Sequence, residues 1–168
     1  MITLFFYAAQ AGLALLSRWI GGRWYIGYFL GGLIYGLYNE VAFEFCWNYS
    51  DLLAPFIWKH VPLIVILGWG VATMLALVIS NRVQEWLKIT NFWKTKAIDV
   101  LAFCAIGLPT ELSMSKLGLW TYNFPIQGEL WMQIYGYVFV GFLVSCAGRT
   151  IQNQLDKKNT TAETPAKN

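Results

Sequence analysis

Three glutamates lie in segments that are otherwise almost entirely apolar: Glu40, Glu44 and Glu111. A carboxylate near the middle of a membrane helix costs about 2.5–3.5 kcal/mol on insertion scales, so such residues are functional candidates. Glycines at four-residue spacing let another helix approach closely, and glutamates on the same stripe are then expected to point into a helix bundle. One such stripe holds Gly32, Gly36, Glu40, Glu44 and Trp47.

The surroundings of these acids predict their chemistry. A carboxylic acid in an apolar, aromatic-walled pocket tends to keep its proton and can act as a general acid. Tyrosine and tryptophan faces stabilise cations. The combination suits protonation of an alkene or epoxide, followed by cyclisation, hydration or isomerisation. Glu40 and Glu111 are the expected acid and base, tuned by Glu44, and the expected substrate-binding residues are Tyr38, Asn39, Trp47, Trp120 and Tyr122.

The sequence offers little to a metal or a cofactor. His60 is the only histidine, which excludes multi-histidine iron, zinc and haem sites. The three cysteines form no CxxC pair, and their odd number argues against a disulfide framework. The net charge of +3 needs no nucleic-acid partner to explain it. We therefore expect no metal, no cofactor and no nucleic acid.

Apolar segments must position the acids. Hydrophobic residues make up 57% of the 168 residues, charged residues 12%, and the mean hydropathy is +0.48. A spanning helix needs roughly 20 mostly apolar residues. The first segment is short, and we interpret it as a retained anchor, with a signal peptide as the alternative. The five expected helices are Ile2–Ser17, Trp24–Trp47, Val61–Ser80, Ala97–Ser115 and Leu130–Ala147.

The basic residues predict the topology. Of the 12 Lys and Arg residues, only Lys59 and Lys116 lie in the second and fourth loops, and the others lie in the first loop, the third loop and the tail. Basic loops stay cytoplasmic, so we expect the N-terminus outside and the C-terminus inside. The prediction is an all-α integral membrane bundle over residues 1–148 with a disordered cytoplasmic tail over 149–168. The bacterial inner membrane is the expected location.

The two external turns resemble each other. Glu40 precedes Trp47-Asn48-Tyr49, and Glu111 precedes Trp120-Thr121-Tyr122, each by less than three helical turns. Helices two and three are thus a candidate parallel repeat of helices four and five, with a site between them. Chance, or the ordinary enrichment of aromatic residues at membrane interfaces, explains so short a match equally well.

Structural roles are the rival explanation for the acids. Pro109 cannot donate a backbone hydrogen bond and is expected to bend or break the fourth helix around Glu111. Asp99 lies near the cytoplasmic start of the same helix, where a helix N-terminus or a cation would stabilise it. The expected ion pairs are Asp99 with Lys96, Glu44 with Lys59, and Glu111 with Lys116.

Several short motifs carry a family resemblance. They are Tyr35–Tyr38, Val61-Pro62, Gly68-Trp69, Gly107–Glu111, Gly118–Tyr122, Gly136 and Gly141. In these motifs the chain resembles polytopic carotenoid-biosynthesis proteins: carotenoid hydratases and, more loosely, membrane lycopene cyclases and fungal-type transmembrane terpene cyclases. It lacks the doubled-acid Pro-x-Glu-Glu form of the lycopene cyclases. The resemblance implies an isoprenoid-modifying role for Glu40 and Glu111.

The hypothesis from the sequence is a membrane-embedded enzyme of the isomerase or lyase type. It would use acid–base chemistry on an isoprenoid or other hydrophobic lipid. The first alternative is a proton- or cation-coupled transporter or a channel subunit, since carboxylates also bind ions. The second is a non-catalytic membrane assembly factor. The expected partners are the lipid bilayer, a hydrophobic small molecule, and a homo-oligomer or a partner membrane subunit.

Overall fold

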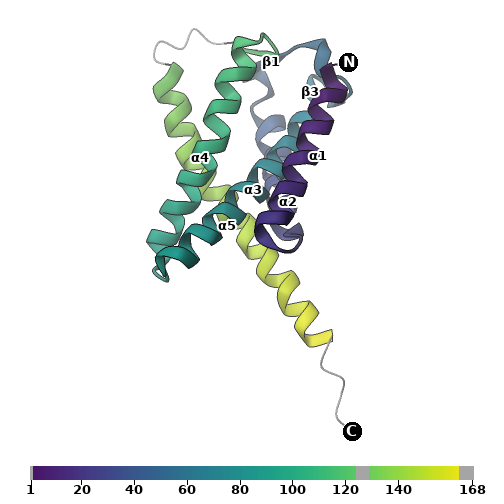
Figure 1. The fold of residues 1–168 in the computed structure, drawn as a ribbon. Helices are drawn as coiled ribbons and strands as arrows, with labels where there is room; N and C mark the ends of the chain where they lie inside the picture. Colours follow the sequence, from purple (N-terminus) through teal and green to yellow (C-terminus); the bar gives the residue numbers. More distant parts are fainter. Residues whose placement is uncertain (1, 124–128, 163–168) are drawn as a thin grey trace.

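The computed structural model of the chain describes residues 2–123 and 129–162. The architecture is mostly helical (Figure 1). Three helices are long and apolar enough to cross a membrane: α3, α4 and residues Ile134–Thr160 of α5. The helices are α1 (Ile2–Gly21), α2 (Ile26–Ala42), α3 (Leu63–Leu87), α4 (Phe92–Lys116) and α5 (Glu129–Ala162). The five apolar segments identified in the sequence therefore each contain a helix.

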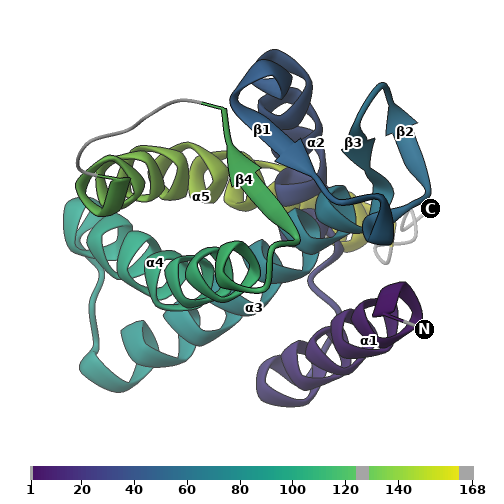
Figure 2. The ribbon, with the colours of Figure 1, turned by 90° about the horizontal axis from the view of Figure 1, so that it is seen from above.

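Four of the helices form a ring. α2 and α4 each pack against both α3 and α5, so the interior of the ring is shared by all four. α1 stands outside the ring and packs on α3, as the view from above shows (Figure 2). In this ring α2, which carries Glu40, faces α4, which carries Glu111, across the interior.

Glycines set the close contact between α2 and α5. A Cβ atom on Gly31 would collide with the backbone of Gly148, and one on Gly27 would collide with the backbone of Gln152. The Gly27 backbone N–H also donates to Gln152 Oε1 at 2.9 Å. Small residues at a helix interface let two backbones approach closely. The glycines for which the sequence predicts this role, Gly32 and Gly36, lie instead against Trp69 and Thr73 of α3.

Short strands cross one end of the bundle (Figure 2). β1 (Trp47–Tyr49) pairs antiparallel with β4 (Trp120–Tyr122), with Trp47 opposite Tyr122 and Tyr49 opposite Trp120. β2 (Phe56–Trp58) pairs with β3 (Val61–Pro62) in a neighbouring hairpin. Two single-turn 3₁₀ helices, Glu44–Cys46 and Asp51–Leu53, flank β1.

The expected extent of the second helix is wrong at its C-terminal end. We expect it to reach Trp47, but α2 ends at Ala42. Trp47–Tyr49 instead forms backbone hydrogen bonds with a second Trp-x-Tyr segment, and aromatic residues fit the pleated surface of a strand well. Glu44 and Trp47 therefore do not continue the helical stripe of Gly32, Gly36 and Glu40.

The structure also differs from the expected tail and from the expected helix break. α5 remains helical to Ala162, past residue 149, and Arg23 forms a two-pronged ion pair with Asp156 on it at 2.8 and 3.0 Å. Residues 163–168 of the expected tail lie outside the described residues. α4 runs through Pro109 without a break. The Thr110 hydroxyl donates to the carbonyl of Ile106 at 2.8 Å, which adds a hydrogen bond to the backbone beside the proline.

Candidate functional site

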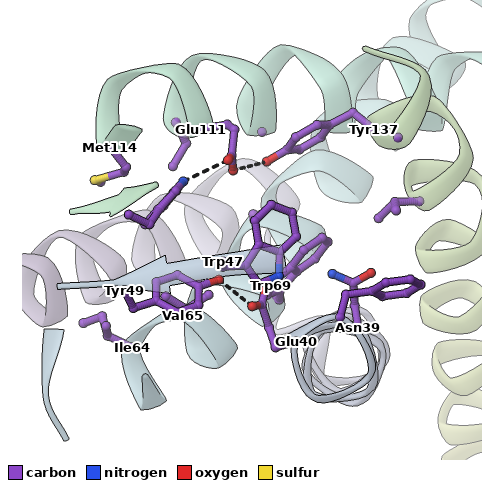
Figure 3. Close-up of a pocket in the computed structure, with 18 of the residues that line it drawn as sticks. Asn39, Glu40, Trp47, Tyr49, Ile64, Val65, Trp69, Glu111, Met114 and Tyr137 are labelled. Atoms are coloured by element: carbon purple, nitrogen blue, oxygen red, sulfur yellow. Dashed lines mark hydrogen bonds between the residues drawn. The ribbon is translucent and has the colours of Figure 1, made fainter. Parts of the chain in front are cut away.

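A cavity of about 560 Å³ lies inside the ring, beside the end that β1 and β4 cross (Figure 3). Its wall is mostly apolar and aromatic, with side chains from all four ring helices and from both strands. Ligand sites commonly enclose roughly 300–1,000 Å³ and combine an apolar wall with a few polar groups. Glu40 and Glu111 are the two acids in the wall, and both face this one cavity.

Glu40 projects from the last turns of α2 and is only 3% exposed. Its Oε1 accepts a hydrogen bond from the indole N–H of Trp69 on α3 at 2.8 Å. Its Oε2 accepts from the Tyr49 hydroxyl on β1 at 2.5 Å. Burial and the neighbouring Glu40 raise the pKa of Tyr49 well above its ordinary value, so the Tyr49 phenol keeps its proton and remains a donor.

Glu111 projects from α4 on the other side of the cavity and accepts three hydrogen bonds. Its Oε1 accepts from the Trp120 indole N–H at 2.8 Å and from the Tyr122 hydroxyl, both on β4. Its Oε2 accepts from the Tyr137 hydroxyl on α5 at 3.1 Å (Figure 3). The two acids are therefore held by the same kind of neighbours: aromatic side chains that donate one neutral hydrogen bond each.

No cation compensates either acid within residues 2–123 and 129–162. None of the ion pairs there includes Glu40 or Glu111, and no Lys, Arg or His lines the cavity. An isolated carboxylate in an apolar site is unfavourable, and a proton on the carboxyl removes that cost. Two carboxyl groups that face one apolar cavity, Glu40 buried and Glu111 half-buried, can exchange protons with a bound molecule, which is acid–base chemistry.

The two halves of the site match in detail. Gly36 lies one turn before Glu40, and a Cβ there would collide with Trp69, the residue that donates to Glu40. Gly107 lies one turn before Glu111, and a Cβ there would collide with Tyr137. Each glutamate thus accepts a hydrogen bond from a Trp-x-Tyr strand and another from an aromatic residue that packs against a glycine. The same contacts therefore occur around Glu40 and around Glu111, as the sequence repeat predicts.

The match continues toward the other end of the ring. The Tyr28 hydroxyl on α2 accepts from Asn81 on α3 at 3.0 Å. In the half formed by α4 and α5, Asp99 takes the place of Tyr28 and Arg149 takes the place of Asn81. Asp99 accepts from Arg149 at 2.8 and 2.5 Å. Arg149 also donates to Asn81 Oδ1 at 3.0 Å and so links the halves. α2 and α3 therefore relate to α4 and α5 by an approximate two-fold axis through the bundle, and the cavity lies between the halves.

The glycines beside the acids lead to a first prediction. Gly36→Ala or Gly107→Ala should displace Trp69 or Tyr137 and lower the free energy of unfolding by about 1–3 kcal/mol, as overpacking does. Thermal unfolding in detergent measures this. Gly12→Ala is the matched control, because a Cβ at Gly12 meets nothing within 4 Å, and alanine favours a helix over glycine by about 1 kcal/mol. Equal stability of all three variants would contradict the packing described above.

Most of the residues predicted from the sequence lie in the cavity wall, and two do not. Asn39, Trp47, Trp120 and Tyr122 line the cavity together with both principal acids. Glu44 lies outside it and pairs with Lys59 at 2.9 Å, because the chain leaves the helical path after Ala42. Tyr38 is 66% exposed on the outer surface of α2. Neither residue contacts the cavity.

Sequence reasoning missed three of the donors. Tyr49 belongs to the first Trp-x-Tyr segment but was not singled out. Trp69 and Tyr137 lie inside apolar helices, where an aromatic residue carries no distinctive signal. The expected pair of Lys96 with Asp99 is confirmed, at 3.4 Å. The expected pair of Lys116 with Glu111 is not among the ion pairs of the described residues, because Trp120, Tyr122 and Tyr137 surround that carboxyl instead.

Among the described residues, no three His, Cys, Asp or Glu side chains gather into a group that could hold a metal ion. Comparison of the chain with profiles of known protein families, with curated proteins and with solved structures gave no match.

Proposed function

We propose that this chain is a multi-pass protein of the bacterial inner membrane, and that its cavity performs acid–base chemistry on a hydrophobic substrate. Apolar outer surfaces support the membrane location. In α4 only 17% of the apolar stretch is buried, and in α5 only 22%. Leu101 and Val138 are among the large side chains exposed there. Exposed apolar area on this scale marks a surface that meets lipid or protein.

The distribution of charge supports the orientation. The loops after α1 and α3 and the C-terminal part of α5 lie at one end of the bundle, opposite the strands (Figure 1). These segments hold Arg23, Lys88, Lys157 and Lys158. Basic residues favour the cytoplasmic side. The strands, the cavity and both acids would then lie toward the outer face, with the N-terminus outside.

The observation that carries the enzymatic proposal is the presence of Glu40 and Glu111 in one apolar cavity with only neutral hydrogen-bond donors around them. A protonated Glu40 would give its proton to one carbon of an alkene, which forms a C–H bond and leaves a carbocation. Glu111, which accepts three hydrogen bonds on the other side of the cavity, would act as the base. It would take a proton from a neighbouring carbon, so that the double bond re-forms elsewhere.

Isoprenoids fit this scheme because branched alkenes give the most stable carbocations. The ring faces of Trp47, Trp69 and Trp120 line the cavity and would stabilise the positive charge in the intermediate. Closure of a ring on that cation gives cyclisation, capture of water gives hydration, and loss of a proton gives isomerisation. Each outcome uses the same two carboxyl groups.

A lipid profile tests the proposal. The wild-type chain and a Glu40→Gln/Glu111→Gln double variant are expressed in a bacterial host that makes carotenoids and other isoprenoids, and the extracts are compared by mass spectrometry. We expect at least one new or depleted isoprenoid with the wild type only. Glu85→Gln, in an exposed pair with Arg82, is the control and should behave as wild type. Identical extracts, combined with glutamate-dependent ion flux in liposomes, would favour transport instead.

A further inference from the structure

The two-fold match between the halves breaks at two polar side chains, and both lie on the Glu40 side of the cavity. The Trp120 indole N–H donates to Glu111. Its counterpart on β1, Trp47, has a buried indole N–H without a hydrogen-bond partner in the described part of the chain. Trp47 stands opposite Tyr122 in the strand pair, and the Trp47 ring lies against the Tyr122 ring with a centroid distance of 5.1 Å.

The second break is at Asn39, one residue before Glu40. The corresponding Thr110 before Glu111 bonds to its own helix through the Ile106 carbonyl. Asn39 is only 9% exposed, and its side-chain amide makes no hydrogen bond with any residue whose side chain the structure describes (3–123 and 134–160). Figure 3 shows this amide on the cavity side of α2, next to Glu40.

Leaving a buried donor without a partner costs about 1–3 kcal/mol, so such groups are normally satisfied. Both residues line the cavity, so an acceptor bound there beside Glu40 would lie next to their side chains. A pure hydrocarbon has no acceptor. An anionic headgroup is a poor occupant as well, because two carboxyl groups and no Lys, Arg or His line the cavity among the described residues.

We infer that the ligand of this cavity is an uncharged lipid that carries an oxygen atom, as an alcohol, ether, epoxide or carbonyl, and that the indole N–H of Trp47 and the amide of Asn39 bind this oxygen beside Glu40. The inference rests on the proposed function and narrows its substrate class. It excludes prenyl diphosphates and unfunctionalised hydrocarbons as the preferred ligands.

Binding to three matched probes tests the inference. The full chain in lipid nanodiscs is equilibrated with geranylgeraniol, with the hydrocarbon of the same skeleton, or with geranylgeranyl diphosphate. Bound probe is counted against empty nanodiscs of the same lipid. We expect the alcohol to bind about tenfold more tightly than either other probe, since one or two net hydrogen bonds are at stake. Trp47→Phe keeps the ring and removes the N–H, and should reduce the preference for the alcohol to about twofold.

Two further variants make the result specific. Asn39→Leu should also weaken the preference, while Trp58→Phe, on the exposed strand β2, should keep it. Equal binding of alcohol and hydrocarbon by the wild type, no binding of the alcohol, or an unchanged preference in both Trp47→Phe and Asn39→Leu would overturn the inference. The proposed function is tested by a different experiment, the lipid profile. It would be contradicted if replacing both glutamates did not change the extracts.

Discussion

Glu40→Gln should lower the turnover of the isoprenoid product by at least about a hundredfold, because a positioned general acid commonly contributes 10²–10⁴-fold. Glutamine has nearly the same shape, and its carbonyl oxygen can still accept from Trp69 or Tyr49, so the cavity should remain intact. It has no transferable proton. We expect the loss in kcat with little change in KM, since the carboxyl acts in the reaction more than in substrate binding.

The comparison among three glutamates makes this prediction specific. Glu111→Gln should cause a loss of similar size, because the step that removes a proton would lack its base. Glu44→Gln is the matched control, since Glu44 lies outside the cavity and pairs with Lys59, and its turnover should stay within about twofold of wild type, as expected for an exposed ion pair. Turnover of Glu40→Gln within threefold of wild type would contradict a role in proton transfer.

The sequence predicts the framework well because membrane-like helices have simple requirements. Runs of apolar residues locate all five helices, and the glycines of α2 indicate a close helix contact. The acids are conspicuous for the same reason: Glu40 and Glu111 interrupt apolar segments, and a polar residue in such a place needs other polar groups around it. Their convergence on one cavity follows from helices that pack side by side.

The sequence predicts wrongly those features of the structure that depend on contacts between segments far apart in the chain. Apart from Glu44, the residues Phe43–Trp47 are as apolar as the helix before them. α2 nevertheless ends at Ala42, and the strand that follows pairs with β4 far along the chain. The C-terminal end of α5 is polar, so its composition alone does not distinguish a helix from a disordered tail. There Asp156 pairs with Arg23, which lies 133 residues away in the chain. Composition cannot encode a partner at that distance.

The aromatic donors show the same limit in the site itself. Trp69 and Tyr137 contact the acids only because Gly36 and Gly107 leave room for them. A glycine one turn before a glutamate in an apolar helix, followed by a Trp-x-Tyr segment, occurs twice in this chain. The sequence contains this pattern, but it does not indicate which aromatic residues of α3 and α5 fill the space beside each glycine.

Asp99→Asn should have the largest effect on stability, a loss of about 3–5 kcal/mol in the free energy of unfolding, because breaking a buried ion pair leaves uncompensated charge behind. The Asp99 side chain is fully buried and accepts from Arg149, Lys96, Ser80 and Gln84. Without the carboxylate, two cations would remain inside the bundle. Chemical or thermal unfolding in detergent measures the loss.

Two controls separate this effect from a general loss of polar contacts. Glu85→Gln removes half of an ion pair with Arg82 whose side chains are 62% and 51% exposed, and it should cost less than about 1 kcal/mol. The double variant Asp99→Asn/Arg149→Gln should recover part of the loss, since one of the stranded cations is gone. A single variant Asp99→Asn as stable as Glu85→Gln would contradict the burial of this network.

The same measurement on Glu40→Gln should give the opposite result. Asp99 has two cations beside it and holds the bundle together, whereas Glu40 is 3% exposed and has only neutral donors. Replacing an uncompensated buried acid with an isosteric amide should leave the free energy of unfolding unchanged or raise it, because burying such an acid costs stability. A loss as large as that of Asp99→Asn would make Glu40 a structural residue.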